Sequence, residues 1–409
     1  MFQEYKGLKK ELYVLFIGRI MTNLGSMIWP MMTLILNTKL GLSASEIANY
    51  LLILSIIQIP VSLYGGKLTD RLNKRNIIII CDLVSVICYL YCGLTPFGRL
   101  SIIIFAIASL FQTVEWPAYD ALVADFTTPK DRDRAYSLNY LGANLGLILA
   151  PTLGGILINE HLDLAFIING LCILLSTILI FFKIKDVSRS EDINDHNEYE
   201  EDLEDGTSIF TFIFKNRVLL LFIIACIFGN TLYSQYNYLM PLDLSFEHGE
   251  LGSIIFGTLS SVNCITVVLF TAYMTKRFRR VTDLNKLIIG ESLQVLGIFL
   301  FRLLLPFYWS AYLAIFVFTL GEIMNTIGSS PFSTKRIPAN YRGRFSSVMN
   351  VSVSILVSLF TKVIGMAYDY LGSWPAWIFV LVFGLIDLIV LLTVKKYDKI
   401  DYPSLNSDK

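Results

Sequence analysis

Four charged side chains lie inside runs of otherwise apolar residues, and their chemistry is the first indication of function. Glu322 lies in "FTLGEIMN" and Glu115 in "EWPAYD", while Arg19 and Lys362 each lie in a long apolar run. A buried carboxylic acid can take up and release a proton, whereas arginine stays protonated and can only hold an anion or a carboxylate. Because an ionised side chain at bilayer depth costs about 2.5–3.5 kcal/mol, we expect these groups to face protein or a water-filled cavity.

Polar and aromatic residues accompany these charges and define a candidate cavity. Asn325 follows Glu322 by about one helical turn, which puts both side chains on one face of a helix. Tyr233 and Tyr236 belong to "NTLYSQYNYLMP", whose rings could stack on an amphipathic or cationic organic molecule. The residues that we expect in a substrate or proton cavity are Glu322, Glu115, Arg19, Asn325, Asp120, Lys362, Asn23, Trp116, Tyr233 and Tyr236.

Each of these residues also has an interpretation in which it serves only the fold. Glu322 could be a protonated acid bonded to a carbonyl group, and Arg19 could pack beside Asp82. Lys362 could extend to the external surface, and the tyrosines could form a belt at the membrane interface. Asp120 could belong to a network at the cytoplasmic face. The sequence leaves these alternatives open.

The elements that must position these side chains are membrane-spanning helices. The chain has 409 residues, of which 55% are hydrophobic and 16% charged, and its mean hydropathy is +0.61, outside the range of a soluble domain. Apolar runs of about 20 residues, enough for a helix to cross the ~30 Å hydrocarbon layer, recur along its length. We predict twelve spans, at 12–36, 44–65, 74–95, 99–126, 135–158, 163–183, 216–241, 251–275, 283–303, 306–330, 345–369 and 374–394.

Several classes of function are excluded by composition. The six cysteines all fall inside predicted spans without a CxxC pair or histidines at metal spacing, so we expect neither disulfides nor a metal site. The formal net charge of zero argues against a nucleic-acid partner. No nucleophile elbow, phosphate-binding loop or soluble catalytic domain is present, which argues against an enzyme. The first run is long and lacks a cleavage site, so we expect a membrane span there and not a signal peptide.

Charge along the chain predicts its topology and its division into halves. Most of the 33 Lys and Arg residues lie in or beside the connections on the side of the N-terminus, which predicts that both termini are cytoplasmic. The acidic stretch at 183–206 has no apolar periodicity and is typical of a flexible linker, with a docking segment as the alternative. We therefore predict an N-terminal six-helix bundle at 1–183, a cytoplasmic linker at 184–212, a C-terminal six-helix bundle at 213–396 and a cytoplasmic tail at 397–409.

A short motif after the second span could form a gate at the cytoplasmic face. The stretch "GGKLTDRLNKR", 65–75, places Asp70 among basic side chains, where it can accept hydrogen bonds from a helix N-terminus. Gly66 would permit close helix approach, and Asn73 is a residue type that tolerates a left-handed turn. Asp125 ends the fourth span and could pair with Arg75 or Arg71. The expected gate residues are Gly66, Asp70, Arg71, Arg75 and Asp125.

This motif resembles the Gly-x-Leu-x-Asp-Arg-x-Gly-Arg-Lys signature of the major facilitator superfamily. Asn73 stands where the family has glycine, and the corresponding later stretch "TKRFRRVTD" lacks the glycine and a well-placed aspartate. A second resemblance lies in the fifth span, "GANLGLILAPTLGG", which is similar to the signature of the drug:proton antiporter branch, with Ala150 in place of a glycine. Its small residues could equally serve close helix packing alone. The residues that match this antiporter motif are Gly142, Gly146, Pro151, Gly154 and Gly155.

The resemblance implies a fold and a function. The fold would be an all-α membrane protein of twelve helices in two pseudo-symmetric six-helix bundles. The function would be proton-coupled export of small hydrophobic or cationic compounds by a monomer in the cell membrane, with the proton gradient as energy source and no cofactor. Glu322 would take part in proton coupling, whereas Asp82, Glu291 and Asp387 would lie on supporting helices. A symporter or facilitator for a polar metabolite is the alternative.

Overall fold

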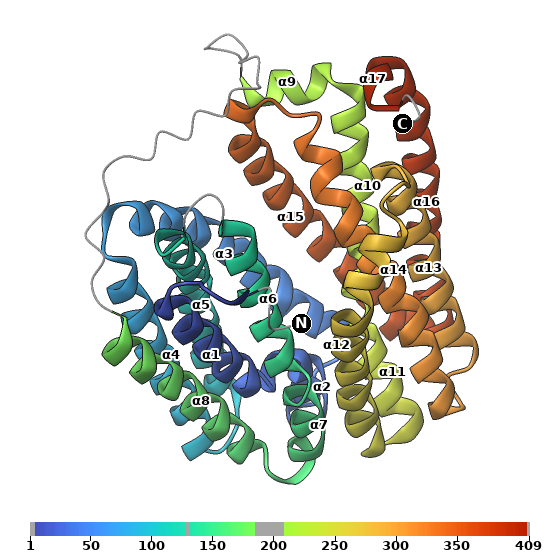
Figure 1. The fold of residues 1–409 in the computed structure, drawn as a ribbon. Coiled ribbons are helices and arrows are strands. Elements are labelled where there is room, and N and C mark those ends of the chain that lie inside the picture. The colour runs from blue at the N-terminus through green and yellow to red at the C-terminus, as the bar shows by residue number, and fades with distance from the viewer. Residues whose placement is uncertain (1–4, 128–130, 185–207, 407–409) are drawn as a thin grey trace. The chain divides into compact units, whose positions relative to one another are not determined.

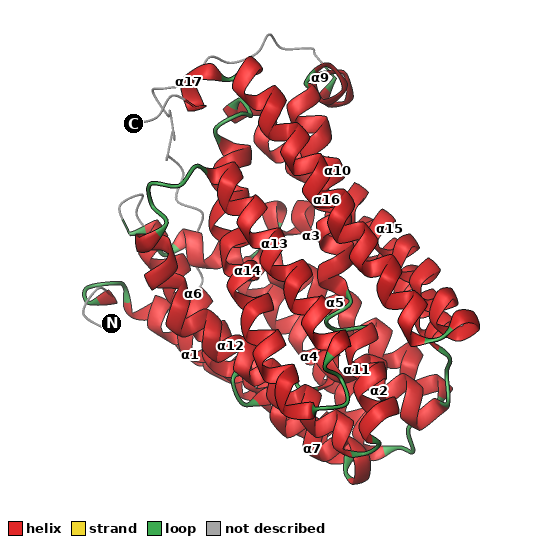
Figure 2. Ribbon diagram, turned by 90° about the vertical axis from the view of Figure 1, so that its right-hand side faces the viewer, coloured by secondary structure: helices red, strands yellow, loops and turns green. Residues whose placement is uncertain are grey.

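Helices form every regular element in the part of the chain that the structure describes. The structure is a computed structural model and describes residues 5–127, 131–184 and 208–406 (Figure 2). Twelve of its helices or helix pairs are long and apolar enough to cross a membrane, which confirms the predicted all-α fold with twelve spans. The helices of Figure 1 are α1 (Lys10–Gly25), α2 (Ile28–Leu40), α3 (Ala44–Arg71), α4 (Lys74–Leu94), α5 (Arg99–Asp125), α6 (Arg132–Leu147), α7 (Ala150–Glu160), α8 (Leu162–Lys183), α9 (Ile209–Lys215), α10 (Arg217–Ser234), α11 (Leu239–His248), α12 (Leu251–Arg277), α13 (Asp283–Leu303), α14 (Tyr308–Thr334), α15 (Ala339–Leu371), α16 (Ser373–Asp401) and α17 (Pro403–Asn406).

Three of the predicted spans are interrupted, each just before a proline. The first span divides into α1 and α2 ahead of Pro30, the fifth into α6 and α7 ahead of Pro151, and the seventh into α10 and α11 ahead of Pro241. A proline lacks the backbone N–H and its ring clashes with the carbonyl group four residues earlier, so it fits the first turn of a new helix better than a helix interior. Hydropathy alone predicts each of these spans as continuous.

The chain forms two compact units. The first unit comprises Met1–Leu42, Ile53–Ile193 and Pro241–Ile265, and the second comprises Ser43–Leu52, Asn194–Met240 and Thr266–Lys409. Most of the predicted linker, 185–207, lies outside the described residues, so the predicted domain boundaries stay a prediction. Two helices cross the predicted limits. The short helix α9 begins inside the predicted linker, and α16 continues through Asp401, inside the predicted tail.

In the first unit, small residues bring α6 and α7 onto α1 and α2. A Cβ atom at Gly142 would lie 2.9 Å from the Phe16 ring, and one at Gly146 would lie 2.6 Å from the Ile20 carbonyl oxygen. A Cβ atom at Gly154 would lie 2.9 Å from the Met27 carbonyl oxygen. Any larger side chain at these positions would push the helices apart, because interiors have no spare volume for even one methyl group.

In the second unit, α13 and α14 run side by side and pack through glycines (Figure 1). A Cβ atom at Gly321 would lie 2.5 Å from the Gly290 carbonyl oxygen, and one at Gly297 would lie 2.8 Å from Phe318. This contact brings the polar faces of the two helices together beside Glu322. Helix α10 packs against α15 and α16. The four helices α10, α13, α14 and α16 enclose a common space.

Candidate functional site

A cavity of about 310 Å³ opens within the second unit, between α10, α13, α14 and α16. Three acidic side chains contribute to its wall, and no lysine, arginine or histidine is found among the lining residues that the structure describes. An excess of carboxyl groups without a basic partner favours a cationic occupant or protons. The polar lining residues are Asn230, Tyr233, Glu291, Gln294, Glu322, Asn325, Thr326, Ser329 and Asp387.

Glu322 is held on this wall by an aromatic neighbour. The hydroxyl group of Tyr233 donates a hydrogen bond to Oε1 of Glu322 at 3.1 Å. The Tyr233 ring stacks on Phe318 with a centroid separation of 5.6 Å, and Tyr236 stacks on the same ring at 5.7 Å. Tyr236 is buried and is not part of the cavity lining. The structure therefore brings Glu322 and Tyr233 together as expected and places Tyr236 behind them.

Two further acids, Glu291 of α13 and Asp387 of α16, form a pair in the same wall. Their residues are 1% and 4% exposed, and their carboxyl groups hydrogen-bond to each other. Gly229 of α10 makes room for them, since a Cβ atom there would lie 2.6 Å from Oδ2 of Asp387 and 3.2 Å from Oε2 of Glu291. The expectation that both acids lie on supporting helices away from the cavity is wrong, because both line it.

Asn325 links the acid pair to α14. Its amide Nδ2 donates to Oε1 of Gln294 at 3.0 Å, and its side chain also hydrogen-bonds to Glu291. Gly290 permits this approach because the Asn325 side chain occupies the place that a Cβ atom would take. The spacing of Asn325 from Glu322 predicts its place on this face. Its partners on α13 could not be predicted, because they come from another helix.

Lys362 is not part of this cavity. Its side chain is half-buried on α15, and it does not appear among the cavity-lining residues or the ion pairs of the described chain. The predicted place of Lys362 in a substrate or proton cavity is therefore not found at this cavity and otherwise stays a prediction. The alternative, a side chain that extends along its helix toward the membrane surface, stays a prediction.

The first unit holds a separate cluster of charges around Arg19. The guanidinium group lies 5.2 Å from the Trp116 ring centroid and 4.8 Å from that of Tyr119, within the range of cation–π attraction. Glu115 is buried nearby, and its charge and that of Asp120 interact with Arg19. The structure thus brings four of the predicted residues together, although Asp120 is exposed at the edge of the cluster.

Two further polar residues interact with the Arg19 cluster. Asn23 donates from Nδ2 to the Arg19 carbonyl oxygen at 2.9 Å, so it supports the backbone of α1. Asp82 of α4 is buried and accepts a hydrogen bond from Thr177 at 2.8 Å. Its charge interacts with those of Glu115 and Arg19, and the alternative in which Arg19 packs beside Asp82 stays a prediction.

The predicted gate residues adopt other partners than expected. Asp125 forms an ion pair with Lys74 at 2.5 Å. Arg75 instead donates to the Phe181 carbonyl oxygen at 2.6 Å and lies over the Phe181 ring. Arg71 is exposed. The expected pairing of Asp125 with Arg75 or Arg71 is therefore replaced by its pairing with Lys74.

The turn that carries the gate motif also differs from expectation. Asn73 has an extended backbone with φ −66° and caps α4, because its side chain accepts a hydrogen bond from the Asn76 amide. A Cβ atom at Gly66 would meet nothing within 4 Å, whereas one at Gly65 would lie 3.2 Å from Val114. Gly65 is thus the residue that permits close approach. The side chain of Asp70 lies outside the described part of the structure.

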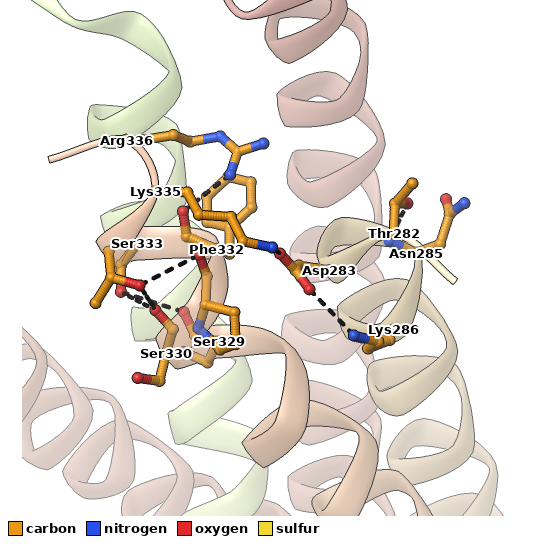
Figure 3. Close-up of polar contacts among 12 residues, drawn as sticks. Thr282, Asp283, Asn285, Lys286, Ser329, Ser330, Phe332, Ser333, Lys335 and Arg336 are labelled. Carbon is orange, nitrogen blue, oxygen red and sulfur yellow. Dashed lines mark hydrogen bonds and ion pairs between the residues drawn. The ribbon is translucent and has the colours of Figure 1, made fainter. Parts of the chain in front are cut away.

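A counterpart of the Lys74–Asp125 pair exists in the second unit with the charges exchanged. Asp283 is the first residue of α13 and bonds to Lys335, at the end of α14, and to Lys286 at 3.1 Å (Figure 3). An acid at a helix N-terminus and a base at a C-terminus both complement the helix dipole, so this polarity is the more favourable of the two. Asp283, the last residue of "TKRFRRVTD", stands at the place of Lys74 and not of Asp70, so this stretch has an acid at the start of α13 without the motif's own aspartate.

The last three residues of the antiporter motif, Pro151, Gly154 and Gly155, belong to α7, which also contacts α12 inside the first unit. A side chain at Gly155 would overlap the Ser253 backbone, and Gly257 packs against the Pro151 carbonyl group. Thr152 Oγ1 and the Ser261 hydroxyl are 2.6 Å apart. The motif therefore serves close backbone packing on two sides, toward α1 with α2 and toward α12.

Comparison with known proteins adds a family. The model of a family described as the Major Facilitator Superfamily matches residues 14–361. Among curated proteins, the chain is 24% identical to a Na⁺, Li⁺, K⁺/H⁺ antiporter of Planococcus maritimus over 86% of this chain and 88% of the relative. It is 24% identical to multidrug resistance protein 1 of Bacillus subtilis, over 89% and 90% of the two chains. It is 26% identical to the quinolone resistance protein NorA of Staphylococcus aureus, over 77% and 79%.

Solved structures support the fold alone. A POT family transporter bound to a thioalcohol-conjugated peptide superimposes with a TM-score of 0.78 at 12% identity, covering 98% of both chains. A point mutant of the nucleoside transporter NupG gives a TM-score of 0.75 at 13% identity, covering 95% of this chain and 99% of its own. At such low identity these structures carry no information about substrate.

Proposed function

Because the chain belongs to the major facilitator superfamily and is therefore a multi-pass membrane transporter and not an enzyme, we propose that it is a proton-coupled antiporter that exports small hydrophobic or cationic compounds. One observation carries this proposal. Glu322 lines a cavity beside stacked aromatic rings, and no basic side chain lines that cavity in the described chain. A carboxylate next to an aromatic face is suited to an organic cation, which it attracts by charge and by cation–π contact.

The exchange follows from competition for negative charge. A cation in the cavity compensates the negative charge of its carboxyl groups, and a proton bound to one of these groups removes part of that charge, so the two occupants compete. Each occupant stabilises the conformation in which it binds better, and the carrier alternates between the two. The two drug-resistance proteins among the relatives agree with an organic cation, although their identity to this chain is about a quarter.

We propose that the protein exports its substrate from the cytoplasm and that both termini lie on the cytoplasmic side. The distribution of Lys and Arg along the connections supports this orientation. A compound would then enter from the cytoplasmic side and leave as a proton enters from outside, down its gradient.

Exchange of a small inorganic cation for protons is a second candidate. Three carboxyl groups converge on the cavity together with the amide groups of Gln294 and Asn325. Their oxygen atoms are suitable ligands for an alkali cation. The Planococcus maritimus relative, named as a Na⁺, Li⁺, K⁺/H⁺ antiporter, agrees with this candidate. The same amides could bind a neutral polar metabolite, which is the alternative that the sequence leaves open.

Transport into proteoliposomes under an imposed pH gradient tests these candidates. The panel contains tetraphenylphosphonium, Na⁺, K⁺ and a neutral sugar, each with an internal pH indicator to report proton movement. We expect accumulation of tetraphenylphosphonium that is driven by the gradient, and a loss of that accumulation in Glu322→Gln. Glu247→Gln is the matched control, because Glu247 is exposed on α11 and outside the cavity. Unchanged coupled transport in Glu322→Gln would contradict the role given to this residue.

A further inference from the structure

The Glu291–Asp387 pair has the features of a site for a proton and not of a packing contact. Packing alone would be served better by apolar side chains, because a buried carboxyl group loses its hydration and needs compensating hydrogen bonds. Here two such groups occupy one site, at 1% and 4% exposure, in the wall of the cavity. Gly229 of α10 leaves space for them.

The hydrogen bonds of the pair are incomplete. A carboxylate has no donor, so the bond between the two carboxyl groups requires that one of them carries a proton. Within the described chain, Oε1 of Glu291 and Oδ1 of Asp387 are buried and have no hydrogen-bond partner. The pair therefore retains acceptor oxygens beside the cavity, where water or a second proton can be bound.

We propose that the Glu291–Asp387 pair is the proton-binding site of the second unit, and that Glu322 is the group that contacts the transported compound. This inference rests on the proposed proton-coupled function and divides it between two sites. Loading is a simple protonation: a proton from water forms an O–H bond on a carboxylate oxygen of the pair, and release reverses that step.

Among the titratable groups around the cavity, the acid pair is the best suited to bind a proton. From α10 the titratable neighbours are Cys226 and Tyr233, and from α14 Glu322. Helix α15 packs on α16 through Phe360 and Phe383, with ring centroids 5.0 Å apart, and contributes no residue to the cavity lining of the described chain. Tyr233 already donates to Glu322, so that acid has a partner whichever state the pair adopts.

Asn325 connects the two sites and acts as a positioning residue. It lies on α14 one turn from Glu322, and its amide bonds to Gln294 and to Glu291. A proton gained or lost at Glu291 changes whether the Asn325 amide donates a hydrogen bond to this carboxyl group or accepts one from it. Since α13 and α14 are in backbone contact at Gly290 and Gly321, any rearrangement at Asn325 shifts the helix that carries Glu322.

The test separates movement of the compound from movement of the proton. The variants are Glu291→Gln with Asp387→Asn, singly and together, and Glu322→Gln for comparison. Three measurements are made with tetraphenylphosphonium: accumulation driven by a pH gradient, exchange of labelled for unlabelled compound at equal pH, and proton release when the compound is added to detergent-solubilised protein in weak buffer.

In the double variant we expect gradient-driven accumulation to fall by at least about fivefold, the lower limit of typical coupling between sites. Exchange at equal pH should stay within about twofold of the unmodified protein, because that reaction needs no net proton transfer. Proton release should be lost. In Glu322→Gln, exchange itself should fall, because that variant removes the group that contacts the compound.

Further variants distinguish the proton role from a structural one. The exchange of the two acids, Glu291→Asp with Asp387→Glu, keeps both carboxyl groups and should restore accumulation and proton release. If the double amide variant does not fold, Glu291→Gln alone is measured for proton release, which should decrease. Retained accumulation and proton release in the amide variants would overturn the proposal, as would proton release that is lost only in Glu322→Gln.

Failure of the proposed function would look different. In that case the unmodified protein itself would show neither gradient-driven accumulation nor proton release with tetraphenylphosphonium, and the same measurements with Na⁺ would decide between the two candidate functions. Absence of both responses with both cations would reject the proton-coupled function and the acid pair's role together.

Discussion

The buried ion pair between Arg336 and Asp398 should be a major contributor to the stability of the second unit. Arg336 donates from Nε at 2.5 Å and from Nη2 at 2.7 Å to the two carboxylate oxygens, and the side chains are 5% and 0% exposed. Removing one partner of such a pair leaves the other charge buried, at a cost of about 3–5 kcal/mol. Asp398→Asn retains one acceptor, so we expect about 3 kcal/mol, the lower limit.

The measurement is thermal unfolding of the purified protein in detergent. For a unit of about 200 residues, 1 kcal/mol shifts Tm by about 2–4 °C, so Asp398→Asn should lower it by about 6–12 °C. The control is Asp401→Asn, about one turn further along the same helix. Asp401 pairs with Arg217, but these side chains are 30% and 48% exposed, so the loss of this pair should lower Tm much less than the loss of Asp398.

A third variant tests the reason behind this difference. Arg336→Met with Asp398→Leu removes both charges, and should recover most of the loss because apolar residues can replace a buried ion pair with little cost. Equal Tm shifts for Asp398→Asn and Asp401→Asn would refute the reasoning, since burial would then not decide the contribution of the pair. A double variant less stable than Asp398→Asn would refute it as well.

Three further predictions follow from close contacts. Gly229→Ala should lower stability by about 1–3 kcal/mol and reduce gradient-driven transport, because its Cβ atom would lie 2.6 Å from Asp387; normal transport would contradict this. Asp369→Ala should lower the free energy of unfolding by about 0.5–2 kcal/mol, because Asp369 accepts hydrogen bonds from two backbone amides at the start of α3; an unchanged Tm would argue against that cap. Asp283→Lys should lower Tm, and adding Lys335→Asp should restore part of it if their ion pair is the cause; no recovery would point elsewhere.

The spans and the unusual charges could be predicted because both depend on local sequence. A run of apolar residues long enough to cross the bilayer is visible without any partner, and so is a carboxyl group inside it. Glu322, Asn325 and Tyr233 are predicted in this way, and the structure places all three on the cavity wall. The family resemblance is likewise carried by short motifs, and the matched family confirms it at the level of the superfamily.

Ion-pair partners were predicted less well, because several basic residues close together in the sequence could each pair with the same acid. Asp125 could have met any of several basic residues after α3, and the start of α4 decides that it meets Lys74. The helix interruptions were missed for a related reason. Pro60 and Pro117 lie within continuous helices, whereas Pro30, Pro151 and Pro241 follow breaks, so a proline alone does not determine which outcome occurs.

The amino-acid sequence by itself therefore determined the membrane location, the number of spans, the class of protein and the presence of acids at bilayer depth. Only the tertiary structure decided which acids act together. Glu291 and Asp387 are far apart in the sequence and lie on helices that were expected to have a supporting role. Their meeting depends on Gly229 of a third helix, which leaves the space that both carboxyl groups occupy. Such a contact depends on helix packing and cannot be predicted from hydropathy or from motifs.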